Sequence, residues 1–195
     1  MKKSSVSKAS VLIPVVILFF LQPALLKSLE FTHSLFPRES TFSIRITMVD
    51  FPFRKVRRVF QRGETSQISF EVRLFRETTG ILSFLGDELI GEHKDTYYGS
   101  YDPFYEMFHL ETSDNSHNFM QEEEFFSAFR SYYTNFVQPE AEAGRMYLKA
   151  RITFTPRKLM PPLNVLEPFL PGSRETTGWV RIPVPKADGN TGGSS

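Results

Sequence analysis

The sequence of 195 residues contains no cysteine. This absence excludes disulfide bonds, thiol catalysis, zinc-thiolate sites and lipid attachment through an N-terminal cysteine. The stability of the fold must therefore come from core packing, for which 20 phenylalanines provide large apolar side chains.

Several motifs of catalysis and cofactor binding are also absent. The sequence has no glycine-rich phosphate loop and no G-x-S-x-G motif. Its four histidines lack metal-ligand spacing such as H-E-x-x-H: His33, His93, His109 and His117. We therefore assign no catalytic residue and expect neither a cofactor nor a metal, with the histidines as ordinary surface or half-buried residues.

The chain has little net charge. It holds 23 basic and 22 acidic residues, and its first 28 residues contain four lysines and no acid. The other 167 residues, enough for one domain with a sizeable core, thus hold 19 basic and 22 acidic residues, a net charge of −3. Because sequence-independent nucleic-acid binding relies on excess lysine and arginine, we expect no nucleic-acid partner.

Residues 1–28 have the pattern of an export signal. A basic start precedes an uncharged apolar run, densest over the 11 residues 11–21. A membrane span needs about 20 apolar residues, and Pro14 and Pro23 interrupt this run. An ordinary buried N-terminal helix is one interpretation, although no polar residue gives the run an amphipathic face. Two export interpretations stay open beside it: a cleaved signal peptide, and an uncleaved anchor over residues 9–26 that holds the protein at the inner membrane. Both predict a periplasmic or other extracytoplasmic location.

Period-two alternation of apolar and polar residues predicts strands with one buried face. These strands cover residues 41–50, 66–76, 88–98, 103–111, 145–156 and 176–184. Gly99 and Ser100 indicate a turn between the third and fourth strands. Residues 30–40 and 112–117 are expected to be polar connections.

Two helices are expected, over residues 53–62 and 121–137. In the first, Val56, Val59 and Phe60 fall on one side, and Gly63 is a helix stop. In the second, Phe125, Phe129, Tyr132 and Phe136 recur at a spacing of three to four, and three glutamates at its start complement the helix dipole.

The C-terminal part is expected to be less regular. The proline-rich residues 156–171 are either an arm that binds a partner or a cover that closes one end of the core. Residues 186–195 are expected to be a disordered tail. Alternating strands with two helices predict a single β-rich α+β domain over residues 29–185. Its strands form one antiparallel sheet or a β-sandwich, with the two helices packed on it.

The order of these features resembles an uncharacterised family of exported bacterial proteins, domain of unknown function (DUF) 4390. The resembling pieces are a strand, the short helix ending at Gly63, the strand Ile68 to Phe75, the strand Leu148 to Phe154 with its exit P-R-K-L-M-P-P-L, and a strand near Trp179. The resemblance covers roughly residues 41–184. It implies a β-rich envelope domain, with no assigned activity and no functional residues to transfer.

One segment, residues 95–105, combines four tyrosines with two aspartates. Stacked aromatic rings with carboxylates are typical of sugar binding. The candidate ligand-binding residues are Tyr97, Tyr98, Tyr101, Asp102 and Tyr105. The alternative is a hairpin whose aromatic side chains pack across strands while Asp102 binds the amides of the turn.

Four acids in or near this segment could supply a carboxylate pair for glycoside hydrolysis: Asp87, Asp95, Asp102 and Glu106. That chemistry needs two carboxylates at a defined separation across a cleft. An antiparallel sheet also exposes many acids that have no catalytic role.

The first predicted helix is strongly basic. Its cations are Arg54, Lys55, Arg57, Arg58 and Arg62. They are candidates for contact with an anionic membrane surface. The alternative is a solvated helix face whose cations pair with acids elsewhere in the domain.

From these patterns we expect a non-catalytic binding or structural module of the bacterial envelope, whose protein partner the sequence does not name. Two alternatives stay open: a carbohydrate-active hydrolase with carboxylates near residues 97–105, and a carrier of an apolar ligand. A hydrolase needs two carboxylates in one cleft, one with a raised pKa. A carrier needs a large closed apolar cavity.

Overall fold

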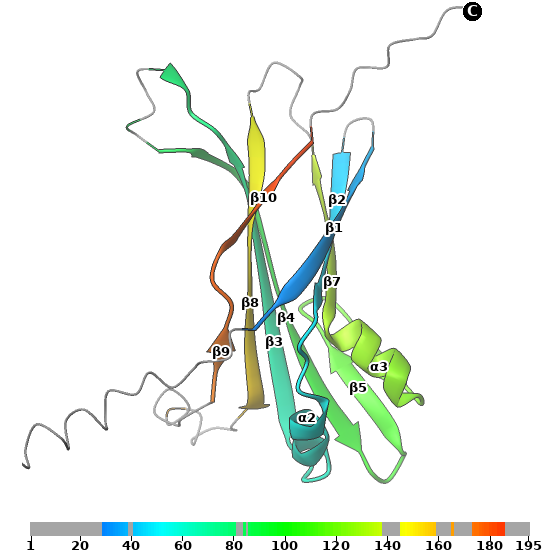
Figure 1. Cartoon of the computed structure of the whole chain (residues 1–195). Helices are drawn as coiled ribbons and strands as arrows, with labels where there is room; N and C mark the ends of the chain where they lie inside the picture. Colours follow the sequence, from blue (N-terminus) through cyan, green and yellow to red (C-terminus); the bar gives the residue numbers. More distant parts are fainter. Residues whose placement is uncertain are drawn as a thin grey trace, which may run out of the picture.

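The computed structural model describes residues 29–38, 41–80, 84, 86–137, 145–158, 165 and 173–185. Within these ranges the chain forms antiparallel β-sheets and two helices, which confirms the predicted β-rich α+β class (Figure 1). The smaller sheet has the order β1-β2-β7, with β1 (Phe31–Pro37), β2 (Thr41–Met48) and β7 (Ser131–Val137).

The larger sheet has the order β10-β8-β3-β4-β5-β6, and β9 also pairs with β8. Its strands are β3 (Thr65–Arg76), β4 (Glu88–Asp102), β5 (Met107–Glu111), β6 (Ser116–Phe119), β8 (Met146–Lys158), β9 (Glu175–Thr176) and β10 (Val180–Pro183). The helices are α2 (Phe53–Phe60) and α3 (Glu122–Phe129).

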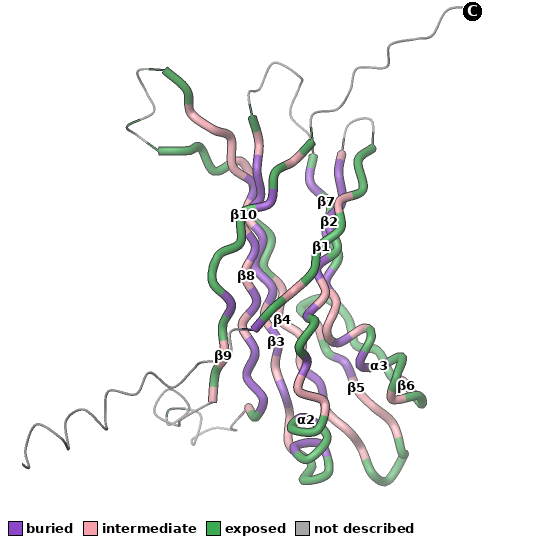
Figure 2. The backbone as a smooth tube through the Cα atoms, in the orientation of Figure 1, coloured by how far each residue is buried: buried purple, intermediate pink, exposed green. Residues whose placement is uncertain are grey.

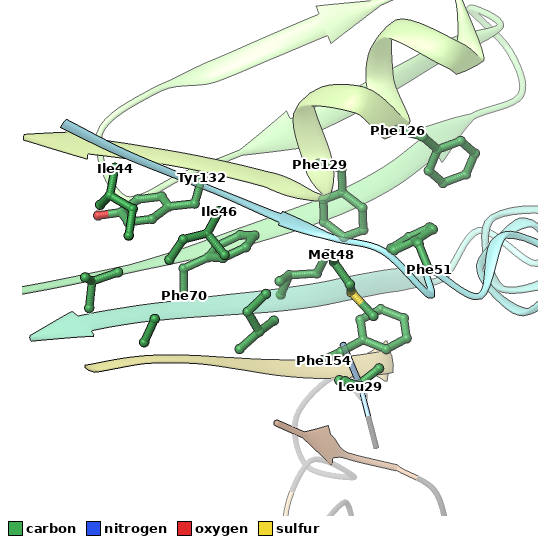
Figure 3. Packing of buried hydrophobic residues seen from close by; sticks show 14 of the residues in the cluster. Leu29, Ile44, Ile46, Met48, Phe51, Phe70, Phe126, Phe129, Tyr132 and Phe154 are labelled. Carbon is green, nitrogen blue, oxygen red and sulfur yellow. The ribbon is translucent and has the colours of Figure 1, made fainter. Parts of the chain in front are cut away.

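The two sheets face each other across one core, as in a β-sandwich (Figures 1 and 3). The alternation predicted from the sequence sets the buried face of each strand. In β2 the buried residues are Phe42, Ile44, Ile46 and Met48, and in β3 they include Ile68, Phe70, Val72 and Leu74. Phe70 stacks on Tyr132 of β7 with ring centroids 5.2 Å apart, so the sheets are in direct contact. Figure 2 shows this burial along β2, β3 and β8, and exposure at the ends of the hairpins.

Both helices lie toward one end of the sheets (Figure 1). α2 buries Val56, Val59 and Phe60 as predicted, and Gly63, with φ of 69°, follows its last turn. α3 carries three glutamates in its first turn and buries Phe125, Phe126 and Phe129. Aromatic rings therefore fill the space between the helices and the larger sheet.

The helix predicted over residues 121–137 is wrong in its second half. α3 ends at Phe129, and β7 continues the chain from Ser131. In β7 Tyr132 and Phe136 are buried while Tyr133 and Asn135 are exposed, so the strand alternates. Two residues four apart share a face in a helix and also in a strand, and the aromatic spacing therefore did not distinguish them. The β-branched and aromatic residues of this segment favour the strand.

Other boundaries also differ from the prediction. Residues 31–37, expected to be a connection, form β1 as an edge strand paired with β2. Gly99 and Ser100 lie inside β4, and the turn falls at residues 103–106, where Glu106 takes a φ of 52°. Residues 112–117 were expected to be a polar connection, but residues 116 and 117 begin β6, which ends at Phe119. The last predicted strand divides into β9 and β10 on either side of Trp179.

The predicted signal or anchor (residues 1–28) and tail (186–195) lie outside the described residues. Of the proline-rich segment, the structure describes only residues 156–158 and Val165, and Pro156 lies within β8. Within the part of the chain that is described, no helix has the length and apolarity needed to cross a bilayer.

Candidate functional site

The outer face of the larger sheet carries polar rows that run across three neighbouring strands. β3 pairs with β4 on one side and with β8 on the other, which brings residues distant in sequence side by side. Along β3, Gln67 lies between Tyr98 and Thr155, Ser69 between Thr96 and Thr153, Glu71 between Lys94 and Arg151, and Arg73 between Glu92 and Lys149. A hydroxyl row thus adjoins two charged rows.

Glu71, the acid on β3 in these rows, forms ion pairs with two arginines. Arg151 Nη2 lies 2.5 Å from Glu71 Oε2, and Arg73 Nη2 lies 2.7 Å from Glu71 Oε1. Burial by itself raises the pKa of Glu71, but the hydrogen bond and charge of Arg151, with the charges of Arg73 and Lys94, outweigh it and lower the pKa below its ordinary value. The Glu71 carboxylate is therefore ionised at neutral pH.

The C-terminal segment returns along β8 and covers part of these rows. Thr177 ties it to Ile152, whose backbone N–H donates to the Thr177 hydroxyl (3.0 Å) and whose carbonyl accepts from the Thr177 N–H (2.9 Å). The Trp179 ring then lies against Arg151 and Arg73, whose guanidinium carbons are 4.5 and 4.9 Å from the ring centroid. The two arginines are therefore fixed from both sides.

Between the hydroxyl row and the returning segment lies a cavity of about 300 Å³, which we call the outer groove. It is lined by Gln67, Ser69, Glu71, Lys94, Thr96, Arg151, Thr153, Thr155, Lys158, Ser173 and Arg174. Four of these residues are basic and one is acidic. Gln67 Oε1 and Arg151 Nε are buried without a hydrogen-bond partner among the described residues, so the polar groups of the groove are not fully paired with one another.

A second, wider cleft of about 1000 Å³ lies between α3, β7 and the β5–β6 hairpin. Its walls include Tyr97, Tyr132, His117, Glu123 and Arg130. Burial raises the pKa of Tyr97 to about 12, with a further contribution from the charge of Asp95. Burial also raises the pKa of Tyr132. Both phenols are therefore protonated at neutral pH, and the Tyr132 hydroxyl already forms a hydrogen bond with the Thr134 side chain.

The structure does not bring the four candidate tyrosines and Asp102 together in one site. Tyr97 packs against Phe70 in the core, and Tyr101 packs against Phe108, because odd-numbered residues of β4 point inward. Tyr98 points to the outer face beside Gln67. The Asp102 carboxylate accepts hydrogen bonds from the backbone N–H groups of Phe104 (2.8 Å) and Tyr105 (3.3 Å). This arrangement matches the alternative of a packed hairpin with a capped turn.

The four candidate carboxylates are distributed along β4 and the turns that flank it. Asp87 accepts a hydrogen bond from the Tyr147 hydroxyl (2.6 Å), which is the main reason that its pKa is lowered. Asp95 accepts from the hydroxyl of Ser113 (2.8 Å) and from the N–H of Thr96 (2.7 Å). Asp102 caps its turn, and Glu106 is exposed within that turn. Three of the four are thus used in local hydrogen bonds.

The cations of α2 divide into paired and exposed ones. Lys55 pairs with Glu175 (3.0 Å), and Arg57 pairs with Glu122. Arg54, Arg58 and Arg62 are exposed and make no ion pair with any described residue. The pairing of cations with acids therefore applies to Lys55 and Arg57, and contact of the others with a membrane stays a prediction.

Within the described residues, no group of three or more histidine, aspartate and glutamate side chains could hold a metal ion. His93 packs edge-on against the Phe136 ring, with centroids 4.7 Å apart, and His109 Nδ1 lies 2.6 Å from the Asn118 side-chain oxygen.

Sequence analysis missed the outer groove. Its signal was the polar half of the alternation in residues 66–76 and 145–156. The pairing of β3 with β8 and the return of residues 173–183 convert that face into a groove.

Comparison with protein-family models, with curated proteins and with solved structures finds no match to this chain. The resemblance to the DUF4390 family therefore stays a prediction.

The substitution Glu71→Gln is expected to lower the free energy of unfolding at pH 7 by about 1.5 kcal/mol, because it weakens the bonds to Arg73 and Arg151. Since the pKa of Glu71 is lower in the folded state, the carboxylate stabilises the fold above its ordinary pKa of 4.5 and loses this effect as the pH falls through the folded value. Urea denaturation should show a gap between variant and wild type that is constant above about pH 5.5 and narrows at lower pH.

The exposed partner of Arg73 provides the control. Glu92 lies 3.2 Å from Arg73 Nε, and Glu92→Gln should change the stability by less than about 0.5 kcal/mol. Equal losses for the two variants, or a gap that does not change with pH, would contradict a stabilising role of the Glu71 cluster.

Proposed function

We propose that the protein is a non-catalytic binding module exported to the bacterial envelope, and that the outer groove binds a sugar-sized ligand bearing a carboxylate or phosphate group. The observation that carries this proposal is the row of hydroxyls Thr96, Ser69 and Thr153 beside the basic residues of the groove. Hydroxyl and amide groups suit the hydroxyls of a sugar, and cations suit its anionic group.

The size and electrostatics of the groove agree with this ligand class. Its volume of about 300 Å³ is at the lower end of the range for small-ligand sites. Lys94 and Arg174 line the groove and form no salt bridge with another described residue, although the charge of Lys94 also acts on Glu71 of the neighbouring strand. Export, the other half of the proposal, is supported by the pattern of residues 1–28.

The alternatives receive less support from the described geometry. A glycosidase needs one carboxylic acid with a raised pKa, whereas the pKa values of Glu71 and Asp87 are both lowered. A carrier needs a large closed apolar cavity, whereas aromatic rings fill the space between the sheets and helices. A binding role for the polar outer face has neither requirement.

Calorimetric titration of the full chain tests this function. We expect binding of galacturonic acid or of glucose 1-phosphate, and no binding of neutral glucose. The two anionic probes distinguish a carboxylate from a phosphate ligand. The double variant Lys94→Ala with Arg174→Ala should weaken binding about tenfold or more. A hydrogen bond to a charged group contributes about 1.5–3 kcal/mol, and a partly exposed one contributes less, so two lost bonds together correspond to at least this factor.

A matched control removes two cations elsewhere. Arg38 and Arg145 are exposed, lie outside the outer groove and make no ion pair among the described residues. Their double alanine variant has the same net charge as the groove variant and should bind like the wild type. Equal weakening in both variants would show nonspecific electrostatic attraction. If neither anionic probe binds, the proposed ligand class is refuted.

A further inference from the structure

The exposed side of α2 carries cations that the fold does not use. Val56, Val59 and Phe60 are buried, and the helical period places Arg54 and Arg58 on the opposite side. The cations on the flanks, Lys55 and Arg57, are those that pair with acids. The part of α2 farthest from the core is therefore positively charged.

Exposed apolar side chains lie beside this surface. Phe104 and Tyr105, in the β4–β5 turn, are 92% and 73% exposed, and Met120, between β6 and α3, is 84% exposed. The hydrogen bonds from the Phe104 and Tyr105 N–H groups to Asp102 fix the backbone of the turn, which presents both rings outward. Exposed apolar side chains that stand singly are normal on protein surfaces, so only their combination with the exposed cations of α2 is informative.

The basic and apolar groups occupy the same end of the molecule. Phe60 of α2 and Phe108 of β5 are in ring contact, with centroids 6.3 Å apart. Met120 lines an open pocket between α2 and the β4–β5 hairpin, whose walls also include the acids Glu106 and Glu122. Figure 1 shows α2 and the β4–β5 turn together at the lower end. We call the set Arg54, Arg58, Arg62, Phe104, Tyr105 and Met120 the basic aromatic end.

The chain that precedes the described part joins it near this end. Phe31, the first residue of β1, pairs with Met48, the last residue of β2, and the Val49 N–H donates to the Glu30 carbonyl (3.0 Å). α2 begins four residues after Val49. Residues 1–28, which the sequence predicts to be an export signal or anchor, are thus attached on the side of the smaller sheet that leads to α2.

We propose that the basic aromatic end docks on the surface of an anionic lipid bilayer. The three arginines attract anionic headgroups, while the phenylalanine, tyrosine and methionine enter the boundary between headgroups and acyl chains. Aromatic rings favour this boundary because it has one apolar and one wet side. Docking in this way leaves the outer groove free and does not depend on its ligand.

The absence of cysteine permits a local test on the full chain. The variant Phe104→Cys, labelled with an environment-sensitive dye, is mixed with vesicles of phosphatidylcholine alone or of phosphatidylcholine with phosphatidylglycerol. We expect a blue-shifted emission only with the anionic vesicles, and its loss at high salt. The variant Arg38→Cys, labelled in the same way on the β1–β2 turn, should show no shift with either vesicle. This comparison separates local docking from attachment through residues 1–28.

Charge variants in the Phe104→Cys background measure the role of the arginines. Arg54→Ala with Arg58→Ala should raise the lipid concentration at half-maximal shift about 25-fold, since each basic residue at an anionic surface contributes about fivefold. Arg38→Ala with Arg145→Ala, which removes the same charge, should change it less than about twofold. Docking through this end is refuted if the emission shifts equally at positions 38 and 104, or if the two arginine pairs have equal effects. It is also refuted if no shift occurs at position 104, which would indicate that a protein covers this end instead.

Discussion

Replacing Phe51 by alanine is expected to lower the free energy of unfolding by about 4 kcal/mol. Phe51 is 5% exposed and follows β2 immediately before α2. Its ring contacts Phe126 and Phe129 of α3 and Phe154 of β8, with centroids 5.5, 5.9 and 5.7 Å away (Figure 3). Truncation removes these contacts and leaves a cavity between α3 and the larger sheet, which the packed rings cannot fully close.

Phe104→Ala is the matched control, since it deletes the same side chain at a 92% exposed position. It should change stability by less than about 0.5 kcal/mol. Urea denaturation followed by far-ultraviolet circular dichroism measures both variants. A loss below about 1.5 kcal/mol for Phe51→Ala would mean that α3 is not anchored through this ring.

The second large effect is expected at Gly99, where β4 passes beneath α3. A Cβ atom at this position would lie 2.8 Å from Phe125 Cζ and 3.1 Å from two atoms of the Phe129 ring. Both rings are fully buried and have little room to move. Gly99→Ala should therefore lower the free energy of unfolding by about 2 to 3 kcal/mol, an unusually large loss for adding one methyl group.

Gly91 of the same strand provides the comparison. Its Cβ would meet the Phe136 ring at 3.6 Å, an ordinary contact distance. Gly91→Ala should leave stability unchanged or raise it by up to about 1 kcal/mol, because alanine reduces the entropy of the unfolded chain. Similar losses at both positions would indicate a general intolerance of β4 rather than close packing against α3.

Much of the fold follows from local patterns in the sequence. The alternation in residues 41–50, 66–76 and 145–156 predicted β2, β3 and β8, and the positions of Val56, Val59 and Phe60 predicted the buried side of α2. These segments alternate strongly or have a clear apolar side, so their hydrophobic period and their tertiary environment agree.

Edge strands and short strands were harder to predict. β1 has mostly exposed residues and is an edge of the smaller sheet, so the alternation that marks a half-buried strand is weak. β7 has a pattern that also suits a helix, and only its pairing with β2, from Thr41 with Val137 to Thr47 with Ser131, establishes it as a strand. Pairing over such sequence distances is not encoded in a local period.

The candidate sites divide in the same way. The composition of residues 95–105 suggested a site built from their tyrosines. Side chains alternate along β4, however, so Tyr97 and Tyr101 point inward while Tyr98 lies on the outer face. The outer groove combines residues from β3, β4, β8 and the segment after residue 172. No one of these segments is unusual in composition, so inspection of each separately could not locate the groove.

The sequence by itself determined the class of fold, the faces of its long strands and the basic character of α2, because these depend on the order of neighbouring residues. Only the tertiary structure decided which polar residues share a groove and which arginines stay unpaired among the described residues. The physical reason is that pairing between β3 and β8 and ion pairs such as Lys55 with Glu175 join residues about 80 to 120 positions apart. Their proximity results from the packing of the whole chain.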